Sequence, residues 1–257
     1  MSPPSPPTDA RDPVQGFSPA GQLLHLLTGY WVSQAIHTAA ELGLADHLGR
    51  TARPIEALAQ ATGAEPGALY RLMRALASVG VFSEPQPRAF ALTPIGALLQ
   101  TEAPGSLRAF ARLQGDDWHW RSWGALSASV KSGRTAVTEL FGAHNNFALL
   151  AERPASAAIF NEAMSGYAAQ VHAAVAEAYD FSSARLVVDV GGGHGTLLAR
   201  VLEQAPDARG ILLDLPDVVV DAPRIFAEYG VADRATAIGG DFFQVVPAGG
   251  DTYLLAT

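Results

Sequence analysis

The sequence contains no cysteine, only one lysine (Lys131) and no run of about 18 apolar residues. Without cysteine, disulfide bonds and thiolate metal sites are excluded. Without a long apolar run or a basic-then-apolar N-terminus, we expect neither a membrane span nor a secretory signal, and therefore a cytoplasmic protein with no membrane partner. Charge is also scarce: charged residues make up 16% of the chain and the net charge is −8. This balance argues against a nucleic-acid partner, because phosphates bind a basic surface.

Apolar residues make up 49% of the 257 residues, which is enough for one large core or two smaller ones. Residues 1–16 are rich in proline and show no apolar periodicity, so we predict a disordered tail there. From Ser18 onward the pattern is helical, with apolar residues at three- and four-residue spacings: Leu23, Leu24, Leu27, Trp31 and Ala35. Because this apolar face is broad and almost uncharged, we expect a second copy of the chain to bury it.

Residues 17–105 are predicted to form a winged-helix domain, because residues 54–99 show a helix, a turn, a second helix and a short hairpin. A winged helix can bind DNA, but residues 1–106 contain six arginines and no lysine against eight acidic residues. The helix in the DNA-recognition position offers only Arg71 and Arg74. We therefore expect this domain to form a homodimer, and a DNA-binding regulator is the weaker alternative.

Residues 106–180 are predicted to form a mostly helical linking segment that is unusually rich in aromatic residues. The aromatic residues gather in three stretches: DDWHWRSWG, ELFGAHNNF and IFNEAMSGY. Such residues form either an ordinary core or the wall of a pocket for a flat small molecule. Under the second interpretation, the candidate substrate-binding residues are His119, Phe160, Asn161 and Met164.

Residues 181–257 are predicted to form part of a Rossmann-like domain. Two strand–turn–helix units begin at Arg185 and Arg209, and two further strands follow in RATAIGG and DTYLLAT. Parallel strands joined by helices form a doubly wound sheet, here in an order like 3-2-1-4, which binds ligands at the C-terminal ends of its strands. The predicted fold class is therefore α/β, with a doubly wound sheet that is incomplete at the C-terminus and follows an α-helical winged-helix dimerisation domain.

The turn GGGHG, between the first of these strands and its helix, indicates the kind of ligand. It has no lysine, which excludes a Walker A loop, and Gly191, Gly193 and Gly195 are spaced G-x-G-x-G rather than as in a dinucleotide loop. Asp189 lies just before the turn, where a carboxylate can face a cationic ammonium group. Asp214 ends the next strand, where an acidic side chain can accept both hydroxyls of a ribose.

These residues, together with the later GDFF, make the chain resemble the class I S-adenosylmethionine-dependent methyltransferases. The whole layout resembles the O-methyltransferases of plant natural-product and bacterial polyketide or carotenoid (hydroxyneurosporene) type. The resemblance implies S-adenosyl-L-methionine as the cofactor and a small hydroxylated natural product as the acceptor. The cofactor contacts that it implies are Asp189, Gly191, Gly193, Gly195, Asp214, Leu215, Gly240, Asp241 and Phe242.

Within that set, Asp241 is expected to face the adenine amino group, with Phe242 against the adenine ring. Asn161 and Met164 are expected close to the transferred methyl group and the acceptor. The histidines are scattered along the sequence, so we expect no metal site.

The last residues, TYLLAT, look like the start of a buried strand. The resemblance implies that the general-base histidine of the family lies beyond Thr257, so no catalytic residue is assigned, and we expect the 257-residue form to be truncated and inactive. Two alternatives remain open. The chain could bind the cofactor without methyl transfer, or it could use the same scaffold for decarboxylase, hydroxylase or pericyclase chemistry.

Overall fold

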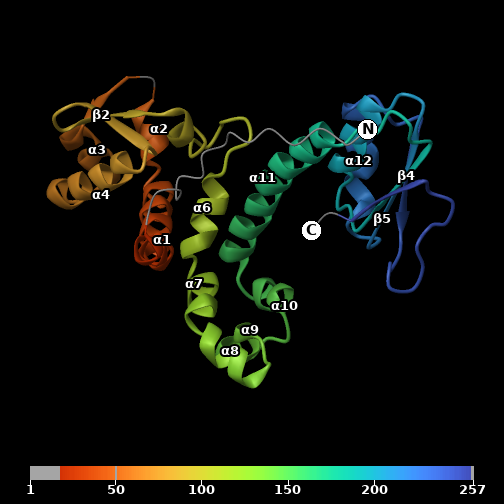
Figure 1. The fold of residues 1–257 in the computed structure, drawn as a ribbon, viewed down its shortest axis with the longest axis horizontal. Coiled ribbons are helices and arrows are strands. Elements are labelled where there is room, and N and C mark those ends of the chain that lie inside the picture. The colour runs from red at the N-terminus through yellow and green to blue at the C-terminus, as the bar shows by residue number, and fades with distance from the viewer. Residues whose placement is uncertain (1–17, 50, 256–257) are drawn as a thin grey trace. The chain divides into compact units, whose positions relative to one another are not determined.

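The structure is a computed structural model that describes residues 18–49 and 51–255 (Figure 1). The chain divides into two compact units, Met1–Phe160 and Asn161–Thr257. The expected disordered tail, residues 1–16, lies outside the described residues. None of the described helices is long and apolar enough to cross a membrane.

The N-terminal part of the first unit combines helices with a small sheet. Its elements are α1 (Pro19–Glu41), α2 (Leu44–Leu48), β1 (Arg53–Pro54), α3 (Ile55–Thr62), α4 (Pro66–Ser78), β2 (Phe82–Gln86), β3 (Ala89–Leu92) and α5 (Pro94–Ala97). β3 pairs antiparallel with both β1 and β2, so the strand order is β1–β3–β2. The helix–turn–helix and hairpin predicted from the sequence are present as α3, α4 and β2–β3, and β1 is an additional strand.

The core of this domain combines apolar stripes on the helices with one face of the sheet. In α4 the buried residues are Leu69, Met73 and Leu76, at spacings of four and three residues. They belong to the same cluster as Phe82 of β2 and Phe90 of β3, both of which are almost completely buried. The amphipathic pattern of the sequence thus places α4 against the sheet.

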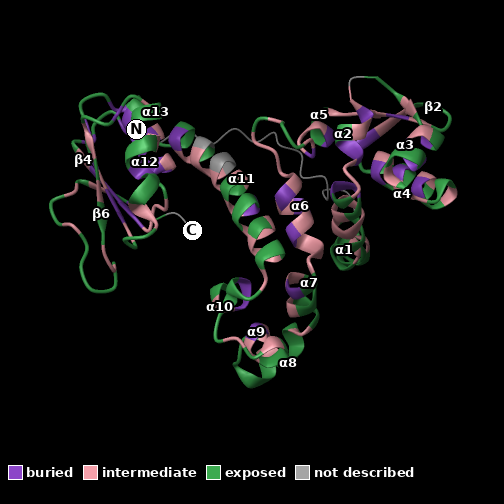
Figure 2. Ribbon diagram, turned by 180° about the vertical axis from the view of Figure 1, so that it is seen from behind, coloured by how far each residue is buried: buried purple, intermediate pink, exposed green. Residues whose placement is uncertain are grey.

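α1 contributes mainly its C-terminal end to this core. Ala39 and Ala40 are buried, whereas Leu24, Leu27 and Trp31 are each about three-fifths exposed. Figure 2 shows most of α1 in the colours of exposed and intermediate residues. The apolar face predicted for this helix is therefore uncovered in the single chain.

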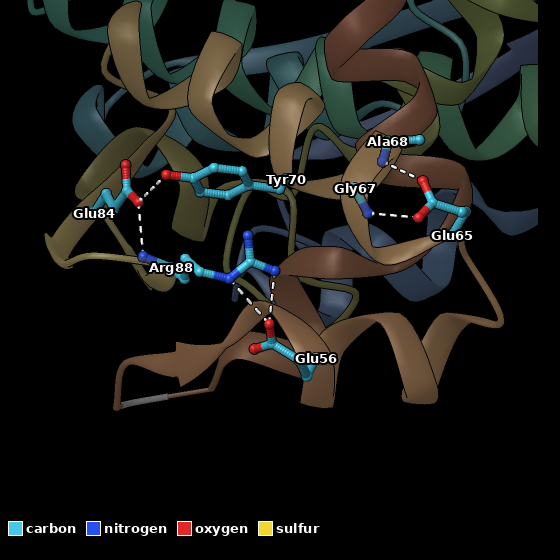
Figure 3. Close-up of polar contacts among 7 residues, drawn as sticks. All are labelled: Glu56, Glu65, Gly67, Ala68, Tyr70, Glu84 and Arg88. Atoms are coloured by element: carbon cyan, nitrogen blue, oxygen red, sulfur yellow. Dashed lines mark hydrogen bonds and ion pairs between the residues drawn. The ribbon is translucent and has the colours of Figure 1, made fainter.

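Polar contacts hold the tip of the β2–β3 hairpin against α3 and α4 (Figure 3). Arg88, at the tip, has a φ of 64°, and its backbone N–H donates to Oε1 of Glu84 (2.8 Å). Its guanidinium donates to Oε1 of Glu56 (2.6 Å) and lies 4.8 Å from the ring centre of Tyr70. Tyr70 donates from its hydroxyl to the same Glu84 oxygen (3.0 Å). The guanidinium of Arg88 is thus paired with a carboxylate of the same domain, that of Glu56.

The helix in the DNA-recognition position, α4, is also surrounded by acidic groups. Glu65 caps it by accepting from the N–H groups of Gly67 (2.8 Å) and Ala68 (2.6 Å), as Figure 3 shows. These amides, with a smaller contribution from Arg71, lower the pKa of Glu65. Arg74 lies 3.8 Å from Glu84. The arginines of this surface therefore have carboxylates beside them, which leaves little positive potential for a phosphate backbone.

The remainder of the first unit is helical. It contains α6 (Arg108–Gly115), α7 (Asp117–Gly124), α8 (Leu126–Ser132), α9 (Ala136–Phe141), α10 (Asn146–Ala151) and the start of α11 (Pro154–Ala178). α6 is joined to α1 by His37, whose Nδ1 donates to the carbonyl oxygen of Arg112 (3.1 Å). The two helices approach closely at Gly115, where an added Cβ would lie 2.3 Å from the imidazole of His37.

The second unit contains the rest of α11 and a parallel sheet with helices. Its further elements are β4 (Leu186–Val190), α12 (Thr196–Gln204), β5 (Arg209–Asp214), the 3-10 helix η1 (Val219–Asp221), α13 (Ala222–Glu228), β6 (Ala235–Gly239) and β7 (Thr252–Leu254). The strand order is β6–β5–β4–β7, with every pairing parallel, which confirms the predicted 3-2-1-4 order. Leu198 of α12, Phe226 of α13 and Leu212 of β5 belong to one buried cluster. The Rossmann-like α/β fold is confirmed.

We expect Gly96→Ala to lower the free energy of unfolding by about 1–3 kcal/mol, because the position has no room for a side chain. An added Cβ would lie 2.2 Å from the carbonyl oxygen of Val81 and 3.1 Å from the ring of Phe82. Gly124→Ala is the matched control, since a Cβ there meets nothing within 4 Å. Urea unfolding followed by circular dichroism measures both variants, and equal stability of the two would contradict this packing.

Candidate functional site

The candidate site lies at the C-terminal ends of three neighbouring strands, β4, β5 and β6. The chain leaving β4 is tied to β5 by the N–H of Gly191, which donates to the carbonyl oxygen of Leu213 (2.8 Å). The chain leaving β6 is tied to β5 by the N–H of Gly240, which donates to the carbonyl oxygen of Asp214 (2.9 Å). Three segments that are distant in the sequence are therefore joined at the edge where doubly wound sheets bind ligands.

The loop between β4 and α12 has a shape that requires glycine. Gly191, Gly193 and Gly195 have φ values of 71°, 61° and 83°, in the left-handed region that other residues rarely adopt. At Gly195 the absent side chain also permits close packing, because a Cβ would lie 2.7 Å from the ring of Phe226. At Gly193 a Cβ would meet nothing within 4 Å, so this part of the loop is open to a ligand.

Asp214 holds the glycine loop in place. Its Oδ2 accepts from the N–H of Gly193 (2.8 Å), and its Oδ1 accepts from the N–H of Leu215 (2.7 Å). Each carboxylate oxygen can accept a second hydrogen bond, and the residue is half-buried at the end of β5. Leu215, which follows it, is 55% exposed. Asp214 can therefore accept two hydroxyl groups of a ligand without losing its contacts with the loop.

Asp189 is the one charged or polar residue that is fully buried in the described part of the chain. Neither of its carboxylate oxygens has a hydrogen-bond partner. Burial raises the pKa of this carboxyl from its ordinary 3.8 to about 7, and the negative charge of Asp214 adds to the increase. The backbone amide of Leu198 opposes part of the shift without reaching the geometry of a hydrogen bond. An unpartnered buried carboxylate is costly for the fold, and a cationic ligand would lower that cost.

Asp241 and Phe242 follow β6 at the same edge. Oδ1 of Asp241 accepts from the N–H of Phe243 (2.9 Å), and Oδ2 accepts from Nε2 of Gln244 (3.2 Å). Phe242 is 39% exposed, and its ring would lie 3.6 Å from a Cβ placed on Gly191. An aromatic ring thus lies beside the glycine loop, and the preceding residue carries a carboxylate. The pair fits a flat heterocycle that carries an amino group.

Gly192 is a residue of this site that the sequence analysis did not single out. An added Cβ would lie 2.3 Å from Oδ2 of Asp189 and 2.7 Å from the side chain of Leu212. Glycine here lets the backbone pass directly over the buried carboxylate. The only signal in the sequence was the middle glycine of the run GGG in GGGHG, which the G-x-G-x-G spacing does not require.

A separate aromatic cluster lies in the first unit. Trp118 is almost completely buried, and its ring centre lies 6.3 Å from that of Phe160 and 5.6 Å from that of His119. Nε1 of Trp123 donates to Nε2 of His119 (3.4 Å). Burial lowers the pKa of His119, which favours the neutral imidazole at pH 7. The cluster therefore offers flat apolar faces and the imidazole of His119, with the carboxylate of Asp116 near that ring.

The predicted site residues fall into two groups. The nine predicted cofactor contacts all lie at the strand ends of the second unit: Asp189, Gly191, Gly193, Gly195, Asp214, Leu215, Gly240, Asp241 and Phe242. The four predicted substrate contacts do not lie there. His119 and Phe160 belong to the aromatic cluster of the first unit. Asn161, which is exposed, and Met164, which is half-buried, lie on α11 in the second unit.

Two family models match the chain. The model of the O-methyltransferase dimerisation domain matches residues 24–102, and that of the O-methyltransferase domain matches residues 123–257. The chain belongs to the S-adenosylmethionine-dependent O-methyltransferases. The resemblance noted from the glycine loop and from GDFF is confirmed, and S-adenosyl-L-methionine is the cofactor of the family.

Individual relatives of this O-methyltransferase chain agree with the family models. Phenazine O-methyltransferase PhzM of Lysobacter antibioticus is 45% identical over 91% of this chain and 68% of that protein. Aclacinomycin 10-hydroxylase RdmB of Streptomyces purpurascens is 38% identical over 91% of this chain and 63% of that protein. Among solved structures, CalO1, a methyltransferase in calicheamicin biosynthesis in its SAH-bound form, gives a TM-score of 0.78 at 34% identity, over 89% of this chain and 67% of that one. The chain therefore spans about two thirds of the length of these relatives.

The residues of this O-methyltransferase site fit its cofactor. Asp189 has an unpartnered carboxylate that would suit a cation, Asp214 has free lone pairs that would suit hydroxyl groups, and Phe242 has a partly exposed ring that would suit a flat heterocycle. Within residues 18–49 and 51–255, no group of three or more histidine or acidic residues could hold a metal ion.

We expect Asp189→Asn to stabilise the second unit, and to do so more at pH 8 than at pH 6, by about 1 kcal/mol. The pKa of Asp189 in the folded chain, about 7, lies above its ordinary value of 3.8. Ionisation therefore disfavours the folded state, and this penalty grows as the pH rises until it levels off above about pH 7. Asparagine has nearly the same shape and cannot ionise.

Thermal unfolding at the two pH values measures this effect. Asp233→Asn, at an exposed carboxylate, is the control and should show no such difference between pH 6 and pH 8. A stability gain from Asp189→Asn that is equal at both pH values would contradict the buried, titrating carboxyl.

Proposed function

We propose that this chain binds S-adenosyl-L-methionine at the strand ends of the second unit and serves methyl transfer to a hydroxyl group of a small natural product of phenolic, polyketide or carotenoid type. One observation carries the proposal: an open glycine loop lies between a buried, unpartnered carboxylate and a second carboxylate that retains free lone pairs. When bound, the cofactor supplies an activated methyl group. The protein supplies binding and orientation.

Each part of the cofactor has a proposed contact. Asp189 faces the ammonium group of the methionine part, and the backbone of Gly191, Gly193 and Gly195 lies along the methionine and ribose. Asp214 accepts the two ribose hydroxyls. The remaining contacts surround the adenine and comprise Leu215, Gly240, Asp241 and Phe242. Their common location at one sheet edge supports this assignment.

We propose that the aromatic cluster of the first unit binds the acceptor. His119 and Phe160 contribute to flat apolar surfaces, and the imidazole of His119 accepts a hydrogen bond from Trp123 on the same helix, α7. The phenazine named for the PhzM relative is a flat aromatic molecule, which agrees with such a surface. The roles of Asn161 and Met164 near the methyl group stay predictions. None of the described residues is assigned as the general base that removes the acceptor's proton.

We also propose that the dimerisation domain forms a homodimer through α1. The apolar residues exposed on this helix support the proposal, and a groove of about 420 Å³ lies beside the same helix in the first unit. The groove is lined mainly by apolar residues of α1, α5 and α6, among them Val32, Ile36, Ile95, Leu98, Phe110 and Ala111. Apolar surface of this extent suits a protein partner, and the acidic groups around the wing disfavour a nucleic acid.

A second candidate is hydroxylase chemistry on the same scaffold. The observation in its favour is that RdmB, a relative at 38% identity, is named a hydroxylase. Mass spectrometry of the product separates the two candidates, because one adds a methyl group to the acceptor and the other adds an oxygen atom.

Asp214→Ala should weaken the binding of S-adenosylhomocysteine by about 1.5–3 kcal/mol, the scale of hydrogen bonds to a charged group. The loss combines the missing ribose contacts with the freed N–H groups of Gly193 and Leu215. Asp217→Ala, at an exposed aspartate of the same loop, should leave the affinity unchanged. Isothermal titration calorimetry at pH 8 measures both. An unchanged dissociation constant for Asp214→Ala would refute the proposed cofactor site.

Leu27→Asp should convert a dimer into a monomer, because it places a charge on the exposed apolar face of α1. Val220→Asp is the matched control: this valine is also exposed but lies in the second unit, so the variant should stay dimeric. Light scattering coupled to size-exclusion chromatography at micromolar concentration gives the masses. A dimer that survives Leu27→Asp would show that α1 is not the interface.

A further inference from the structure

We propose that Asp189 carries a proton before the cofactor binds and releases it to solvent when the cationic methionine end of the cofactor binds at the glycine loop. The inference rests on the proposed cofactor site and concerns a change of protonation that accompanies binding. The released proton comes from the side-chain carboxyl of Asp189, and its O–H bond is the only covalent bond of the protein or the cofactor that changes.

The enclosure of Asp189 carries this inference. The residue lies in the middle of the sheet, paired with Leu212 of β5 on one side and with Leu254 of β7 on the other. Its exposed fraction is 0%, and both carboxylate oxygens lack a hydrogen-bond partner. The backbone of Gly192 lies directly against the carboxyl group, since a Cβ placed on Gly192 would lie 2.3 Å from Oδ2 of Asp189. A carboxylate with neither water nor a donor around it is far less favourable than the neutral acid.

The charges that face Asp189 favour the same state. β5 contributes Asp214, a second carboxylate, whose charge opposes ionisation of Asp189. The first turn of α12, residues 196–199, has no charged side chain and contributes only the amide of Leu198. β7 contributes the uncharged Leu254, and the loop itself carries His194, which is exposed. Among the described neighbours, therefore, no cation compensates a charge on Asp189.

A bound cation reverses this balance. An ammonium group beside the loop would favour the ionised carboxylate by direct attraction in a region of low dielectric constant. The pKa of Asp189, about 7 without ligand, would then fall well below neutrality. The complex binds fewer protons than the free chain and the free cofactor together. The affinity for the cofactor therefore increases as the pH rises and decreases as the pH falls.

The test is calorimetric titration of the full chain with S-adenosylhomocysteine, which carries the ammonium group and undergoes no methyl transfer. In buffers of different ionisation enthalpy at pH 7, we expect the release of about half a proton for each ligand bound, since the pKa of the free carboxyl is close to the pH. The affinity should increase about tenfold between pH 6 and pH 8. These measurements need no variant, so they test the proposal even if a substitution prevents folding.

Two variants identify the group that releases the proton. Asp189→Asn should bind more weakly at pH 8, release no proton and lose the pH dependence. His194→Gln removes the imidazole of the same loop and should leave the release unchanged.

The outcomes separate this inference from the proposed function. Binding of S-adenosylhomocysteine without proton release, or release that persists in Asp189→Asn, would overturn the inference and leave the cofactor site intact. Release of the same fraction by methylthioadenosine, which lacks the ammonium group, would also overturn it. No binding at any pH would refute the cofactor site itself, and the inference with it.

Discussion

The hydrogen bond from the N–H of Gly193 to Oδ2 of Asp214 is the contact on which the candidate site depends. The loop after β4 is made of glycines, which adopt many conformations, so its shape must come from an outside contact. Asp214 provides this contact from the end of β5 and keeps lone pairs free for a ligand. The same carboxylate also raises the pKa of Asp189 through its charge. One side chain therefore holds the shape of the loop and adds to the effect of burial on the pKa of Asp189.

Asp189 illustrates a conflict between stability and binding. Its position between β5 and β7 suits a valine or a leucine, such as the buried neighbours Leu212 and Leu254 that pair with it. A carboxyl group there lowers the free energy of unfolding, because it finds no partner within the fold. Residues of this kind are retained where a ligand supplies the missing partner, and activity often depends on such locally unfavourable groups.

The first unit shows that a fold does not determine a function. Its helix–turn–helix and wing have the arrangement of a DNA-binding domain, but Arg88 is directed at Glu56, and Arg74 lies beside Glu84. Most of the large apolar side chains of this domain that remain uncovered lie on α1 instead. The surface of this domain therefore favours a protein partner, in agreement with its match to a dimerisation domain.

The order of strands, the winged helix and the location of the glycine loop could be derived from the sequence. Each of them follows from local rules: apolar periodicity, the preference of turns for glycine, and the handedness of strand–helix–strand connections. The apolar face of α1 was equally visible, because helical spacing alone places Leu24, Leu27 and Trp31 on the same side.

The chemical state of the site residues was decided only by the tertiary structure. The sequence placed Asp189 before the loop but did not show that it is fully buried beside Gly192, Leu212 and Leu254, which come from three different segments. The lowered pKa of His119 likewise depends on its burial within the first unit. A pKa depends on the solvent and charges around a group, and these are set by residues that folding brings together from distant parts of the chain.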